Sequence, residues 1–87
     1  MHAVVVRVNV GDPESAQGEL QTQVVPRVSQ SPGFVAGYWT RKENQKLSMI
    51  VFDSEDAARE AADRIPQHLP QSVELQDIEV RQVVANA

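Results

Sequence analysis

The chain has 87 residues, with 8 Lys and Arg against 12 Asp and Glu, a net charge of −4 and no cysteine. Its cations are scattered, which argues against the clustered basic surface that nucleic acids and anionic membranes require. The lack of cysteine excludes disulfides and thiolate metal sites, and a chain this short buries only about 60% of its surface. We therefore expect one small domain, residues 1–87, stabilised by oligomerisation.

Targeting and metal signals are also missing from the sequence. No apolar run approaches the roughly 18 residues of a membrane-spanning helix, and the N-terminus lacks the charged and apolar segments of a signal peptide. His2 and His68 do not have the spacing of metal ligands. We expect a soluble cytoplasmic protein without metal, nucleic-acid or membrane partners.

The first half of the chain predicts a strand followed by a helix. Residues 3–10 are β-branched and predict a strand, with Val4, Val6, Val8 and Val10 on one face and Ala3, Val5, Arg7 and Asn9 on the other. Residues 13–29 predict a helix, because Asp12 suits the N-cap position and an apolar residue recurs every fourth position. Pro26 should kink or end this helix near Val25.

The second half predicts two paired strands, a helix and a last strand. A Ser-Pro-Gly turn at 31–33 precedes strands at 34–41 and 46–52, which are joined by a polar hairpin tip at 43–45. Asp53 or Ser54 should cap a second helix, and Pro66 should end it. Residues 73–84 predict the last strand.

The order β-α-β-β-α-β predicts a ferredoxin-like α+β plait, a four-stranded antiparallel sheet with two helices on one face. Both faces of that sheet are largely apolar, because the third strand places Leu47, Met49 and Val51 on one side and Ile50 and Phe52 on the other. An apolar sheet face exposed to water is unfavourable in a monomer. We therefore expect two copies to pack face to face as a homodimer.

A polar group interrupts this apolar sheet. Residues of matching parity on the first and last strands can share one face, namely Arg7, Asn9, Asp77, Glu79 and Arg81. One interpretation is a charged pocket for a small acid or a quinone-like substrate. The other is a set of cross-strand ion pairs at the dimer seam, which the balance of two cations against two carboxylates favours.

Residues 31–63 read SPGFVAGYWTRKENQKLSMIVFDSEDAAREAAD. This segment resembles the antibiotic-biosynthesis-monooxygenase-like families of the dimeric α+β barrel superfamily. The resemblance implies a homodimer with a shared β-barrel and a pocket between the helices and the sheet. It also implies cofactor-free oxidation of a phenolic or quinol-type aromatic molecule, which Asn, Tyr, Trp and Arg side chains hold in place.

On that resemblance, the catalytic candidates are Asn9 with Tyr38 or Trp39, and the substrate-binding candidates are Arg7, Phe52 and Arg81. Tyr38 and Trp39 are adjacent on a strand and must point to opposite faces. The alternative interpretation is that both are packing residues, one in the core and one at the dimer interface.

The haem-degrading branch of the superfamily combines an Asn on the first strand, a Trp on the third and a His on the second helix. Asn9 matches, but the third strand offers Phe52 instead of Trp, and Pro66 should end the helix before His68. We expect no metal and no tight haem binding. A non-catalytic small-molecule-binding or stress-associated protein and an amino-acid-sensing regulatory module remain alternatives, because fold alone does not determine function.

Overall fold

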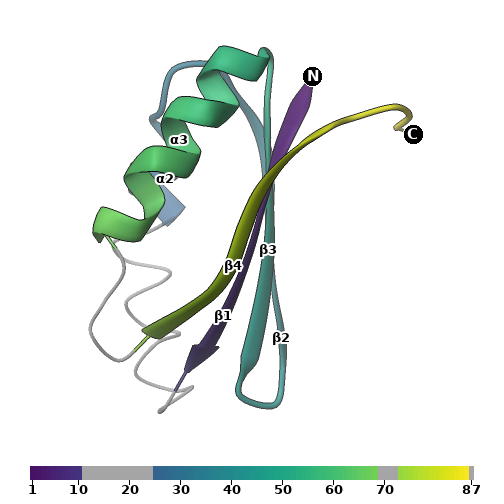
Figure 1. Ribbon diagram of the computed structural model, residues 1–87. Helices are drawn as coiled ribbons and strands as arrows, with labels where there is room; N and C mark the ends of the chain where they lie inside the picture. The colour runs from purple at the N-terminus through teal and green to yellow at the C-terminus, as the bar shows by residue number, and fades with distance from the viewer. Residues whose placement is uncertain (11–24, 69–72, 87) are drawn as a thin grey trace.

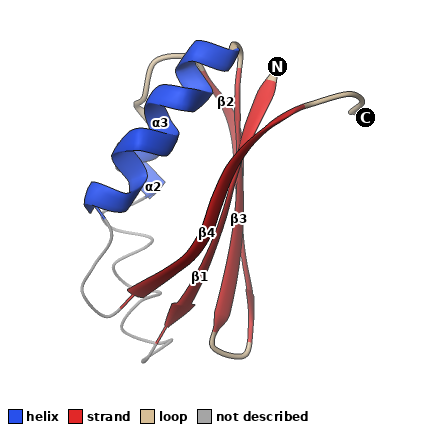
Figure 2. Ribbon diagram, viewed as in Figure 1, coloured by secondary structure: helices blue, strands red, loops and turns tan. Residues whose placement is uncertain are grey.

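The computed structural model describes residues 1–10, 25–68 and 73–86. Its elements, in chain order, are β1 (His2–Val10), α2 (Val25–Ser29), β2 (Phe34–Lys42), β3 (Gln45–Phe52), α3 (Glu55–His68) and β4 (Val73–Gln82). The strands form one antiparallel sheet in the order β2-β3-β1-β4. Both helices lie on the same side of this sheet (Figures 1 and 2). The ferredoxin-like plait predicted from the sequence is confirmed.

The core lies between α3 and the face of the sheet that carries the even-numbered valines. Val4, Val6 and Val8 of β1 pack with Ile50 and Phe52 of β3, and the cluster is completed by Val28, Ala58 and Ala61. Phe52 and Val4 are fully buried, and burying side chains of this size contributes about 1.5–3 kcal/mol each. Phe34 meets Phe52 edge to face, with ring centroids 6.3 Å apart.

Gly33 gives the turn before β2 its backbone conformation. Gly33 has a φ of 80°, a region that only glycine adopts without strain, and a Cβ at this position would overlap the Asp53 carboxylate and Ala57. Its carbonyl accepts a hydrogen bond from the Asp53 amide at 2.8 Å. The Ser-Pro-Gly turn is thereby held against the start of α3.

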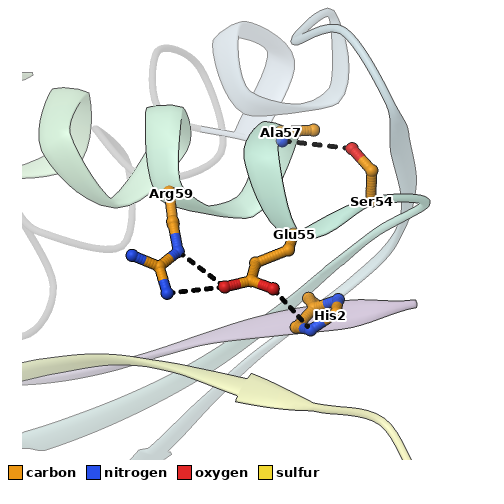
Figure 3. A network of polar contacts seen from close by, with 5 residues as sticks. All are labelled: His2, Ser54, Glu55, Ala57 and Arg59. Carbon is orange, nitrogen blue, oxygen red and sulfur yellow. Dashed lines mark hydrogen bonds and ion pairs between the residues drawn. The ribbon is translucent and has the colours of Figure 1, made fainter.

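The N-terminus of α3 is capped and tied to the first strand. Ser54 Oγ accepts a hydrogen bond from the Ala57 amide at 3.2 Å, which confirms Ser54 as the cap. Glu55 accepts a hydrogen bond from Arg59 Nε at 2.9 Å, and its other oxygen lies 3.6 Å from His2 Nε2 (Figure 3). The contacts of Ser54 and Arg59 are exposed and add little stability, and the contact of Glu55 with His2 joins the start of α3 to the start of β1.

The prediction that Pro66 ends the second helix is wrong, since α3 contains Pro66 and continues to His68. Pro66 lies in the last turn, where it removes one backbone hydrogen bond instead of breaking a helix interior. The Gln67 side chain donates to the Asp63 carbonyl at 3.2 Å and satisfies one acceptor of this turn.

The expected helix at 13–29 is described only from residue 25. Pro26 lies within α2, which continues to Ser29. The cap at Asp12 and the rest of that predicted helix lie outside the described residues. Within the described part of the chain, no helix is long and apolar enough to cross a membrane.

Candidate functional site

The side of the sheet away from α2 and α3 is called the open face here. No described helix covers it (Figure 2). Its large apolar side chains are exposed, with Leu47 at 41%, Met49 at 45% and Tyr38 at 65%. Strand alternation places on this face Ala3, Val5, Arg7, Tyr38, Leu47, Met49, Val51, Glu79 and Arg81.

A cavity of about 460 Å³ lies at the end of the sheet where β2 turns into β3. We call it the hairpin-end cavity. It is lined by residues of all four strands, namely Arg7, Val8, Asn9, Thr40, Arg41, Lys42, Gln45, Lys46, Leu47 and Gln76. In Figure 1 the β2–β3 hairpin extends at the bottom of the view, away from α3.

Strand register brings these residues to one end of the sheet. Val8, Arg41 and Lys46 lie on the helix side, and Arg7, Asn9, Thr40, Lys42, Gln45 and Leu47 lie on the open face. Asn9 lies opposite Gln45 and Arg7 opposite Leu47 across β1 and β3, and Thr40 Oγ1 donates to the Leu47 carbonyl at 2.6 Å. On the other side of β1, Arg7 pairs with Asp77 but Val8 pairs with Leu75, so Gln76 is the extra residue of a bulge. Bulges re-aim side chains at sheet ends, and Gln76 joins the lining.

The charges of the described lining are all positive. Arg7, Arg41, Lys42 and Lys46 contribute to it, and none of the described Asp or Glu residues does. Lys46 is only 7% exposed, and its pKa is lowered below 10.5 by desolvation on burial and by the nearby charge of Arg41. Such a site favours anions, including a phenolate or enolate that forms within it.

Two of the predicted site residues, Arg7 and Asn9, meet in this cavity. Tyr38 and Trp39 do not line it and point to opposite faces, as their adjacency predicted. Trp39 packs against the core cluster with its ring over Gly37, whereas Tyr38 lies opposite Met49 on the open face.

Phe52 and Arg81 lie at the far end of the sheet. Phe52 pairs with His2 and is a fully buried core residue, and Arg81 pairs with Ala3. Arg81 forms an ion pair with Glu79 at 2.9 Å, which runs along β4. The register does place Arg7, Asp77, Glu79 and Arg81 on one face, as their parity predicted.

Sequence reasoning missed the second half of the lining, from Arg41 and Lys42 to Gln45 and Lys46. A signal for it was present. Lys42 and Gln45 flank a two-residue turn, so they pair across the hairpin, and the cations on both sides of the turn converge with Arg7. The described residues contain no group of three side chains suited to a metal ion.

No family model matches this sequence, and no curated protein does. Among solved structures, the chain is similar to the heme-degrader MhuD from Mycobacterium tuberculosis, determined with two hemes bound in its active site. The identity is 18% over 97% of this chain and 98% of that chain, with a TM-score of 0.54. A likeness at this identity shows the fold alone, the four-stranded antiparallel sheet with helices on one side.

Proposed function

We propose that this protein is a small dimeric α+β-barrel protein that binds an acidic aromatic or quinol-type molecule in the hairpin-end cavity and oxidises it with dioxygen, without a cofactor. The observation that carries the proposal is that Asn9 and Arg7 line one cavity, in which the charges of the described residues are all positive. The resemblance of residues 31–63 to the antibiotic-biosynthesis-monooxygenase-like families supports the reaction type.

The proposed oxidation requires two things of the protein: an environment in which the substrate anion forms, and a hydrogen-bond donor to the oxygen that carries the charge. A cationic cavity lowers the pKa of a phenol or of a carbonyl-activated CH₂, so that the reactive anion forms near neutral pH. The Asn9 amide can donate a hydrogen bond to the oxygen that carries this charge. With an anthrone, dioxygen converts the CH₂ to a carbonyl and the second oxygen atom leaves as water, so no external reductant is needed.

The dimeric part of the proposal concerns the open face. Tyr38, Leu47 and Met49 expose apolar surface there, which a second copy would cover. Leu47 belongs both to the open face and to the cavity lining. In a face-to-face dimer the cavity would therefore border the interface, and the partner would shield it from water.

The test is oxygen uptake with anthrone- and hydroquinone-type compounds, without added cofactor. We expect uptake above buffer, and Asn9→Ala should lower it by about 10-fold or more, as loss of an oxyanion donor does, with the dimer intact. Asn44→Ala, at the exposed hairpin tip outside the lining, is the matched control and should leave uptake unchanged. Rates equal to buffer across the panel would reject the oxidase reaction.

A non-catalytic binding protein is the second candidate. Within the described lining no carboxylate or imidazole is available as a general base, which favours binding without turnover. An amino-acid-sensing role is less well supported, because the described lining offers no carboxylate to pair with the ammonium group of an amino acid. Tight binding of a quinol analogue without oxygen uptake would favour this second candidate.

We further predict that the protein does not bind haem tightly. One sequence-based reason, that Pro66 ends the second helix before His68, is wrong, since α3 reaches His68. The second reason, the lack of a Trp on the third strand, remains. The residues of β3 on the helix side are Lys46, Ser48, Ile50 and Phe52. A haem titration should leave the Soret band as in buffer. A Soret shift that His68→Ala abolishes would contradict the prediction.

A further inference from the structure

We infer that the ligand of the hairpin-end cavity carries a permanently anionic group, a carboxylate, sulfonate or phosphate, which binds against Lys46. This inference rests on the proposed function for the location of the ligand, but it adds a chemical requirement that the oxidation itself does not need. An oxidisable phenol or quinol can be neutral before it ionises, whereas the group inferred here is charged in solution.

The first observation is how the chain pairs its cations. Of its 8 Lys and Arg residues, half line the cavity: Arg7, Arg41, Lys42 and Lys46. Outside the cavity, Arg59, Arg64 and Arg81 form ion pairs with Glu55, Glu60 and Glu79, and Arg27 also has an interaction of its own. The cations of the cavity form no ion pair within 4 Å with any described residue. Among the described residues, Arg27 aside, the Lys and Arg side chains without an ion pair are therefore all in this lining.

The second observation is the burial of Lys46. At 7% exposure it is the one buried charged side chain among the described residues, and it has no hydrogen-bond partner within the described part of the chain. Desolvation disfavours the charged form of Lys46, and the neighbouring Arg41 adds repulsion. An anion in the cavity would relieve both costs at once, because it supplies the missing partner and neutralises the like charges.

The carboxylates nearest in register do not provide this partner. Asp77 lies opposite Arg7, Glu74 lies opposite Asn9, and Glu43 lies at the hairpin tip, but none of them lines the cavity. Carboxylates of a second copy are the competing occupants, because the cavity borders the open face. The experiment must therefore separate loss of ligand from loss of the dimer.

The experiment is a calorimetric titration with benzoate, phenyl phosphate and the neutral benzyl alcohol, none of which is a quinol. We expect at least one of the two anions to bind at least 10-fold more tightly than the alcohol, since a hydrogen bond to a charged group is worth about 1.5–3 kcal/mol. The two anions show whether a carboxylate or a phosphate fits better. High salt should weaken the anion and leave the alcohol unchanged.

Lys46→Met should reduce the anion's affinity by about 10-fold or more, and Arg59→Met, which removes an exposed cation outside the cavity, should leave it unchanged. If Lys46→Met does not fold, the exposed Lys42→Met should still lower the affinity. Sedimentation of each variant should give the same oligomeric state as the parent. A variant that dissociates the dimer would instead assign these cations to seam ion pairs and overturn the inference.

Equal binding of benzoate, phenyl phosphate and benzyl alcohol, or equal effects of Lys46→Met and Arg59→Met, would also overturn it. The outcome is separable from that of the proposed function. If oxygen uptake with quinols is normal but anions bind no better than the alcohol, only this inference fails. If an anion binds selectively and no compound is oxidised, only the proposed reaction fails.

Discussion

Lys46 is the residue whose surroundings depart most from its ordinary preference. It lies in β3 on the helix side of the sheet, is buried, and faces the charge of Arg41. Burial of a lysine is tolerated where its aliphatic stem packs and its amine reaches a polar site. Desolvation and the charge of Arg41 therefore disfavour the charged form of Lys46 in the folded state.

The lowered pKa of Lys46 predicts how stability depends on pH. Because the folded pKa lies below 10.5, the folded state binds fewer protons than the unfolded state between these two values, and stability rises with pH there. We expect Lys46→Met to be more stable than the parent at pH 7. This advantage should shrink as pH rises through the folded pKa towards about 10.5.

Urea unfolding at pH 7 and near pH 10.5 measures this difference. Arg59→Met should show no such convergence with the parent, because Arg59 is exposed and stays charged throughout. An advantage of Lys46→Met that is the same at both pH values would contradict the account of this residue.

At the scale of elements, strands were predicted more accurately than helix ends. Valine alternation in residues 3–10 separated the two faces of β1, because a two-residue period leaves few choices; the structure then shows that the face with the even-numbered valines meets α3. Pro66 misled the prediction, since the cost of a proline depends on its position within a helix that the sequence does not delimit. The bulge at Gln76 has no local signal, because it arises from the pairing of β4 with β1.

The contrast between local sequence pattern and tertiary packing also explains which residues of the cavity lining were predicted. Arg7 and Asn9 stood out because they are polar residues in an apolar strand, and they line the cavity. Lys46 did not stand out, because a lysine beside a polar hairpin is ordinarily solvated. Its burial follows from tertiary packing, which a single sequence does not reveal.

The β2 strand offers a test of packing at this scale. A Cβ at Gly37 would lie 2.6 Å from the Trp39 ring, so Gly37→Ala should displace the indole from the core. Overpacking of this kind costs about 1–3 kcal/mol. Because Trp39 is the only Trp, its fluorescence reports the displacement directly. Unchanged emission together with unchanged urea stability would show that the ring does not pack as described.

At the scale of the whole molecule, the exposed apolar side chains of the open face are the reason to expect a dimer in solution. Its exposed Tyr38, Leu47 and Met49 and the small size of the chain both favour a second copy as its cover. Met49→Asp should yield monomeric or unfolded protein, because it would bury an unpaired carboxylate at the interface. Val84→Asp, at a residue 88% exposed outside the sheet, should leave the assembly unchanged.

The face-to-face dimer is the central proposal, because it would cover the open face and border the hairpin-end cavity. Sedimentation equilibrium of the unmodified protein at micromolar concentration tests it most directly. A chain of 9.6 kDa should sediment as a single species of twice that mass, and Met49→Asp should remove that species. A single 9.6 kDa species of folded parent protein would contradict the claim.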